Sequence, residues 1–204
     1  MEHGERFNTA THFAGLLLAA AGAVALLQKA QASGDDWKIG AATGFGLSML
    51  FLYAASTLYH GSGSARKARW AVLDHCAIYA LIAGTYLPFA LVTLRGLWGG
   101  VLLGLVALMA LAGICNELLR ARRAPPPLWL YVANGWIGVA ALVPAIWQLD
   151  AGGVAGLLAG ALLYSAGVWF YRFGERVKHA HGIWHLFVLG GTASHYFTVL
   201  IFVI

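Results

Sequence analysis

Two histidines four residues apart, His181 and His185, have a spacing that suits metal binding. Residues at positions i and i+4 of a helix lie on the same face, one turn apart. Paired histidines on one helix bind a single zinc ion in known enzymes. The pair alone is a weak signal, because histidines at a membrane interface can share this spacing without binding a metal. A metal site therefore needs further ligands from other segments.

Such residues occur in two distant segments. His60 follows Ser56 at the same four-residue spacing, and Asp74 lies in the next apolar stretch. His60 would complete a three-histidine set with an open fourth position, which is the catalytic type of zinc site. Zinc in such a site lowers the pKa of water and polarises carbonyl groups. Asp74 could then hold the water and accept its proton, while Ser56 could hydrogen-bond a developing oxyanion.

The composition indicates where these residues must be positioned. Of 204 residues, 60% are of the AVILMFWYC type and 10% are charged, whereas soluble domains carry roughly 25% charged residues. So few charges cannot cover a water-soluble globule, which argues against a soluble enzyme, a disordered tail or a nucleic-acid module. Cys76 and Cys115 lie in apolar stretches and give no disulfide framework. We therefore expect a polytopic membrane protein.

The apolar runs predict an all-α protein with a single seven-helix transmembrane domain, residues 1–204. Helices are expected rather than barrel strands because the runs are continuous and long enough to cross the hydrocarbon core. The first helix is expected to start earlier than its apolar run, near Asn8. Pro88 and Pro144 are expected to kink the third and fifth spans. The predicted spans are about 13–27, 39–59, 70–94, 97–119, 128–149, 154–173 and 182–204.

The basic residues predict how these spans face the membrane. Ten of them fall on the side of the N-terminus, namely Arg6, Arg66, Lys67, Arg69, Arg120, Arg122, Arg123, Arg172, Arg176 and Lys178. Three fall on the other side, Lys29, Lys38 and Arg95. The positive-inside rule then predicts a cytoplasmic N-terminus and an external C-terminus.

This topology brings the candidate site residues to one depth. His60 ends the second span at the cytoplasmic side, and Asp74 lies about 7 Å in from Arg69 at ~1.5 Å per residue. His181 and His185 open the last span on the same side. Because separate segments deliver polar groups to one leaflet, a metal centre near the cytoplasmic face is the favoured interpretation.

Other polar or small residues in the spans are expected to stabilise the helix bundle rather than to form the site. His75 points about 100° away from the neighbouring aspartate and is assigned either to packing or to a supporting position around the site residues. His195, about 20 Å beyond the start of the last span, is expected to hydrogen-bond within the bundle, with a role in a proton path as the alternative. Glu117 is expected to pair with Arg120 at the interface. Spaced glycines are expected to pack helices inside the bundle rather than at a dimer face; they are Gly40, Gly44, Gly100, Gly104, Gly152, Gly156 and Gly160.

Four short motifs are spread over the chain. They are Glu5-x-x-Asn8-x-x-x-His12, Ser56-x-x-x-His60, Asp74 and His181-x-x-x-His185. Together they resemble the hemolysin III family, the bacterial branch of the progestin and adipoQ receptor (PAQR) superfamily, over essentially the whole chain. In the first motif, Glu5 is expected to cap a helix or pair with a loop arginine, Asn8 to cap the first helix, and His12 has no predicted role.

The resemblance implies a zinc ion, Zn2+, on His60, His181 and His185. Asp74 is implied to contact this ion through water, with Ser56 close by. The set is similar to that of alkaline ceramidases and other membrane hydrolases. The resemblance also implies a bacterial inner membrane location, membrane lipids as partners, a lipid substrate or ligand, and a part in lipid homeostasis. No nucleic-acid partner is expected, and a homo-oligomer stays open.

Three functions remain after this reasoning. The preferred one is a zinc-dependent hydrolase of a lipid amide or ester, in which Asp74 moves the proton and Ser56 steadies the oxyanion. The second is a sensor or regulator of membrane state in which the same zinc is structural. The third is a pore-forming haemolysin, for which the sequence offers no ring of like charges and no amphipathic pore-lining face.

Overall fold

The computed structural model describes residues 4–120, 128–173 and 177–204. Within these residues it contains seven α-helices, one short π-helical turn and no strand, which confirms the predicted all-α class. The elements are α1 (Glu5–Ser33), α2 (Asp36–Gly61), α3 (Ser64–Pro88), η1 (Phe89–Thr93), α4 (Leu97–Arg120), α5 (Leu128–Ile146), α6 (Ala151–Arg172) and α7 (Ala180–Phe202).

Six of these helices are long and apolar enough to cross a membrane: α1, α2, α3 together with η1, α4, α6 and α7. α5 includes residues whose side chains lie outside the described part of the structure, and it is not counted among the six. The described residues therefore establish a multi-pass helical membrane protein.

Two helix ends follow from local backbone chemistry. α1 begins at Glu5 with Gly4 as its N-cap, so the prediction that Asn8 caps this helix is wrong: Asn8 lies inside it.

At the end of α3, Pro88 has no N–H to donate to the helical ladder. The chain continues there as the wider η1 turn, in which Leu94 N donates to Phe89 O at 2.7 Å, so the helical ladder changes at the proline where a kink was predicted.

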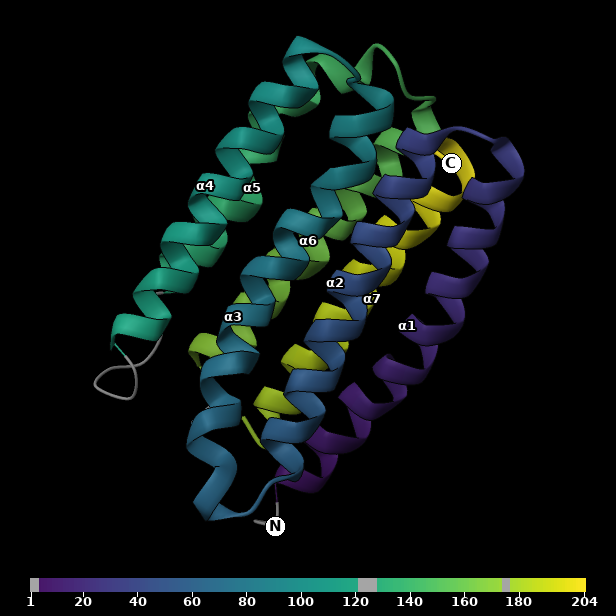
Figure 1. Cartoon of the computed structure of the whole chain (residues 1–204). Helices are drawn as coiled ribbons and strands as arrows, with labels where there is room; N and C mark the ends of the chain where they lie inside the picture. The colour runs from purple at the N-terminus through teal and green to yellow at the C-terminus, as the bar shows by residue number, and fades with distance from the viewer. Residues whose placement is uncertain (1–3, 121–127, 174–176) are drawn as a thin grey trace.

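The helices alternate up and down, and the last helix packs beside the first (Figure 1). The two termini themselves lie at opposite ends of the bundle. α1 packs on α2 and α2 on α3, while α6 packs on α7, which closes back onto α1. α4 and α5 form an outer pair beside α3. The start of α1, the end of α2 and the start of α7 therefore meet at the lower end of the bundle in this view.

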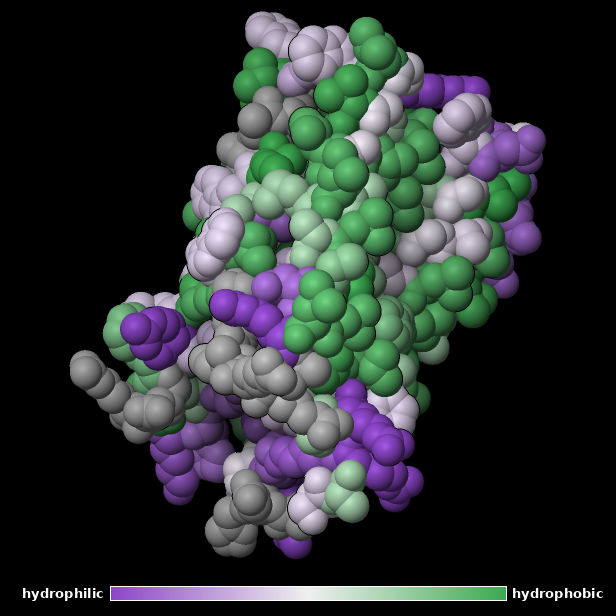
Figure 2. All heavy atoms as spheres, turned by 60° about the vertical axis from the view of Figure 1, so that its left-hand side comes forward, coloured by the Kyte–Doolittle hydropathy of each residue, from purple (hydrophilic) through white to green (hydrophobic). Residues whose placement is uncertain are grey.

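The surface has the pattern expected of a protein in lipid. A broad hydrophobic band covers the middle of the face shown in Figure 2, with hydrophilic residues gathered towards its ends. Large apolar side chains are exposed along the helices, among them Leu18, Leu108 and Leu162. Exposed basic residues at the end where α1 begins are Arg6, Arg66, Arg69, Arg120, Arg172 and Lys178. Arg122, Arg123 and Arg176 lie outside the described residues.

The spaced glycines divide into two groups. Those of α6 face α7, where a Cβ would come within 2.7 Å of Phe202 at Gly152 and within 2.1 Å of Thr198 at Gly156. This confirms close packing inside the bundle for α6, and Gly44 is likewise in contact with α3. The same expectation is wrong for Gly40, Gly100 and Gly104, because a Cβ at these positions would meet no neighbouring atom within 4 Å.

Candidate metal centre

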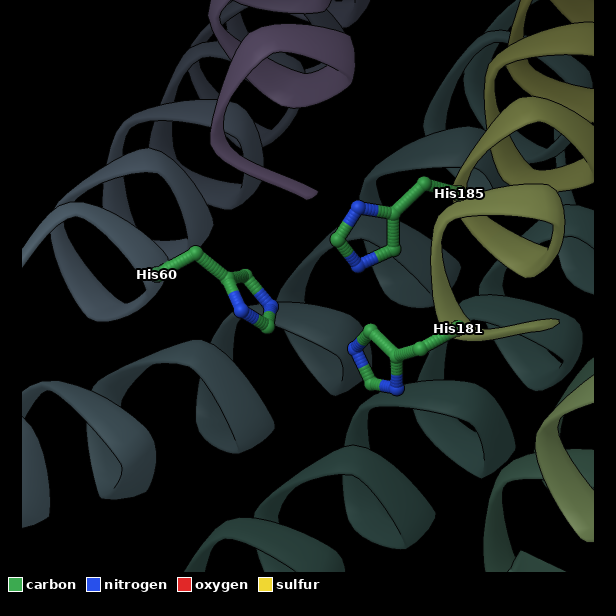
Figure 3. Close-up of side chains that lie close together, drawn as sticks. All are labelled: His60, His181 and His185. Carbon is green, nitrogen blue, oxygen red and sulfur yellow. The ribbon is translucent and has the colours of Figure 1, made fainter. Parts of the chain in front are cut away.

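Three histidines converge where α2 ends and α7 begins. His60 lies in the last turn of α2, and His181 and His185 lie in the first two turns of α7. One ligand atom from each can be chosen so that all three atoms lie within 4.8 Å of one another. The three rings surround a common space beside the start of α1 (Figure 3). The convergence predicted from helix spacing and depth is thus present in the structure.

The ring nitrogens of these histidines fit a metal. Nε2 of all three is buried and has no hydrogen-bond partner among the residues described. Leaving a buried polar atom without a partner is unfavourable, and three imidazole rings this close together could hold a metal ion. Two ligands of one zinc ion, each roughly 2.0–2.1 Å from it, are at most about 4.2 Å apart. Because the ligand atoms lie within 4.8 Å of one another, side-chain rotations would have to bring them closer to hold one ion.

In His60 and His185 the other ring nitrogen is fixed by contacts from α1. His60 Nδ1 lies 2.5 Å from Glu5 Oε2, and His185 Nδ1 lies 3.3 Å from the backbone oxygen of Asn8. Carboxylate and carbonyl oxygens only accept hydrogen bonds, so in both rings Nδ1 carries the proton. Nε2 of each ring then presents its lone pair to the common space, which is the tautomer that a metal ligand needs.

These contacts give the first motif a role that the sequence analysis did not assign. Glu5 pairs with His60 and with Lys67, rather than capping a helix or pairing with an arginine. Thr11 Oγ1 also lies 3.2 Å from the Nδ1 atom that Asn8 contacts. The spacing of these residues places them on one face of the first turns of α1. Their shared face, at the predicted depth of the metal centre, is the sequence feature that could have indicated a role beside the histidines.

Glu5 is expected to tune metal affinity through His60. In Glu5→Gln, the amide keeps the shape of the side chain but loses the charge that supports the ring, so zinc affinity should fall roughly 10–100-fold. A competitive titration with a chromogenic chelator measures this. Glu117→Gln, which changes a buried carboxyl away from the centre, is the matched control and should keep wild-type affinity. Equal affinities for all three proteins would contradict the assigned role of Glu5.

His12 is a fourth buried histidine beside the centre. Its ring stacks on His185 with centroids 3.6 Å apart and meets the ring of Tyr53 edge-on at 5.2 Å. The side chain is 2% exposed, and neither ring nitrogen has a partner among the described residues. His12 is not a member of the metal-ligand set, but it places an unpaired polar ring next to it.

Ser56 and Asp74 line the same internal cavity as His12. This cavity has a volume of about 170 Å³ and is walled mainly by apolar side chains of the bundle. Ser56 is fully buried and lies close enough to Asp74 for their side chains to interact, and Asp74 is 6% exposed. The structure therefore brings both predicted residues to the cavity that adjoins the histidine set, whereas their catalytic roles stay predictions.

The remaining polar residues lie away from the metal centre. His75 Nδ1 is 3.4 Å from Glu117 Oε2, so Glu117 contacts His75 directly, while the predicted partner Arg120 acts on it through its nearby charge. Glu117 is 7% exposed, because α4 packs on α3 and turns this side chain inward. His195 Nε2 lies 3.2 Å from Leu157 O, which confirms the predicted hydrogen bond within the bundle.

The fold and the site together define a multi-pass helical membrane protein with a set of three histidines beside a cavity in the bundle. The Haemolysin-III related family matches residues 1–196, and the chain belongs to this family. It is 40% identical over 199 residues to Hemolysin-3 of Bacillus cereus, covering 97% of this chain and 90% of that protein.

Two further relatives extend this comparison. The Hemolysin-3 homolog of Bacillus subtilis (strain 168) is 40% identical over 197 residues, covering 96% of this chain and 92% of that protein. Monocyte to macrophage differentiation factor of Homo sapiens is 30% identical over 175 residues, covering 82% of this chain and 72% of that protein. The family resemblance expected from the motifs is confirmed.

Proposed function

We propose that this protein is a zinc-dependent hydrolase of a lipid amide or ester, with a part in membrane lipid homeostasis. The observation that carries the proposal is the set of three histidines with unpartnered Nε2 atoms, next to a cavity lined by Asp74 and Ser56. Imidazole ligands with an open coordination position suit zinc. A predominantly apolar cavity inside the bundle suits a lipid chain.

The proposed topology has seven spans, with α5 as the fifth, in a bacterial inner membrane. α1 begins and α7 ends at opposite ends of the bundle (Figure 1). The exposed basic residues near the start of α1, including Arg6 and Arg66, support a cytoplasmic N-terminus by the positive-inside rule. The metal centre would then open towards the cytoplasmic leaflet.

The chain's own residues would carry out the proton transfers. When bound, zinc acts as a Lewis acid that polarises a carbonyl and makes water a stronger nucleophile. Asp74 would hold the attacking water and take its proton as the new carbon–oxygen bond forms. Ser56 Oγ would donate a hydrogen bond to the developing oxyanion. When the carbon–nitrogen or carbon–oxygen bond to the leaving group breaks, Asp74 would return the proton to the amine or alcohol.

The test is release of fatty acid by purified, zinc-loaded protein in lipid nanodiscs. A panel of N-acyl amides and acyl esters is offered, and free fatty acid is measured by mass spectrometry. We expect release from at least one of these classes, lost on treatment with a chelator and restored by zinc. If the loaded protein releases no fatty acid while the chelator still lowers its unfolding temperature, hydrolysis is contradicted and the zinc is structural. That outcome would favour the sensor, because the histidines join α2 to α7.

A further inference from the structure

His195 lines the cavity at a distance from the metal centre. It is on α7, ten residues beyond His185, which corresponds to about 15 Å along the helix axis. Its ring lines the same cavity as Ser56 and Asp74. The cavity therefore has polar groups at two separated places, and only one of them belongs to the metal centre.

The proton of the His195 ring can be assigned from its contacts. Nε2 lies 3.2 Å from the backbone oxygen of Leu157 on α6, and a carbonyl oxygen can only accept. Nε2 therefore carries the proton, and Nδ1 is an acceptor with a free lone pair. Packing holds the ring in this position: a Cβ at Gly160 would come within 2.2 Å of two of its atoms, and the ring of Tyr164 lies 5.5 Å away.

Nδ1 of His195 has no donor among the described residues. Three hydroxyls that line the same cavity are already engaged. Thr85 Oγ1 donates to Leu81 O and Ser165 Oγ donates to Ala161 O, both at 2.8 Å. The hydroxyl of Tyr164 pairs with Thr192 at 2.8 Å. A buried acceptor without a donor is costly, so its partner must come from whatever occupies the cavity.

We infer that His195 forms a polar subsite that accepts a hydrogen bond from a hydroxyl group on the hydrocarbon chain of the bound ligand. The inference rests on the proposed function, because it takes a lipid as the occupant of the cavity. The hydroxyl would lie about 15 Å from the metal centre along the direction of α7. Hydroxylated acyl chains should then be preferred to plain chains of equal length, by about tenfold for one hydrogen bond.

The experiment uses palmitic acid and a series of palmitic acids that each carry one hydroxyl at a different carbon. Each competes with a fluorescent fatty acid for the full-length, zinc-loaded protein in detergent. We expect one hydroxyl position to bind the wild type about tenfold more tightly than palmitic acid, and this ratio to fall to about one in His195→Leu. Ser165→Ala changes a cavity hydroxyl that is already bonded internally and should keep the wild-type ratio.

His195→Gln provides a second variant in case the leucine protein does not fold. Its side-chain oxygen is also an acceptor, so part of the preference should remain, and zinc content reports whether each variant is folded. Equal binding of hydroxylated and plain acids by the wild type overturns the inference, because a water molecule would then satisfy Nδ1. An unchanged ratio in His195→Leu also overturns it. If no acid of either kind binds, the proposed lipid cavity fails as well.

Discussion

Purified His185→Ala protein is expected to contain less than roughly a tenth of the zinc of the wild type, which should hold about one ion per chain. His185 is fully buried, and its Nδ1 is anchored by the backbone of Asn8. Removing the ring leaves two histidines, of which only His60 has a carboxylate behind it. Two ligands in a buried site cannot satisfy a four-coordinate ion, so the metal should be lost during purification.

Mass spectrometry of detergent-purified protein, prepared without added chelator, measures this loss. His195→Ala is the matched control, because it removes another histidine of α7 that lies about 15 Å further along the helix. The control should keep wild-type zinc content. Metal-free wild-type protein would contradict the zinc proposal itself, and full zinc content in His185→Ala would mean that the ion binds elsewhere.

The parts of the site that the sequence predicted are those fixed by spacing along a helix and by depth in the membrane. His181 and His185 share a face because they are one turn apart, and His60 reaches them because α2 ends where α7 begins. Both facts follow from helix geometry and from the order of the apolar runs. No knowledge of how the helices pack was needed for either.

The parts that the sequence did not predict depend on how each helix is rotated about its own axis. Glu117 was expected at the interface with an arginine, but packing of α4 on α3 turns it towards His75. Glu5 was assigned to a cap or a loop, but packing of α1 beside α2 and α7 brings it onto His60. Apolar runs of nearly uniform composition do not fix these rotations. Polar residues that repeat on one face of a helix, as in the first turns of α1, do indicate how that helix is rotated.

Asp74→Asn is expected to keep its zinc and to lose about 10²–10⁴-fold in kcat for fatty acid release. The substitution preserves the size of the side chain, so the fold and the histidine set should be unaffected. The amide cannot take a proton from water, and the loss should therefore appear in kcat rather than in KM. This separation distinguishes a residue that moves a proton from one that only shapes the cavity.

Zinc content and steady-state kinetics on the same preparations test this expectation, using a substrate that the wild type cleaves. Asp150→Asn is the matched control, because Asp150 is exposed at the start of α6 and lies at the opposite end of the bundle from the histidines. It should retain wild-type turnover. Full turnover by zinc-loaded Asp74→Asn would exclude this carboxylate as the proton acceptor. Loss of zinc in the variant would instead mean that Asp74 helps to hold the metal. A fall in kcat could then not be assigned to proton transfer.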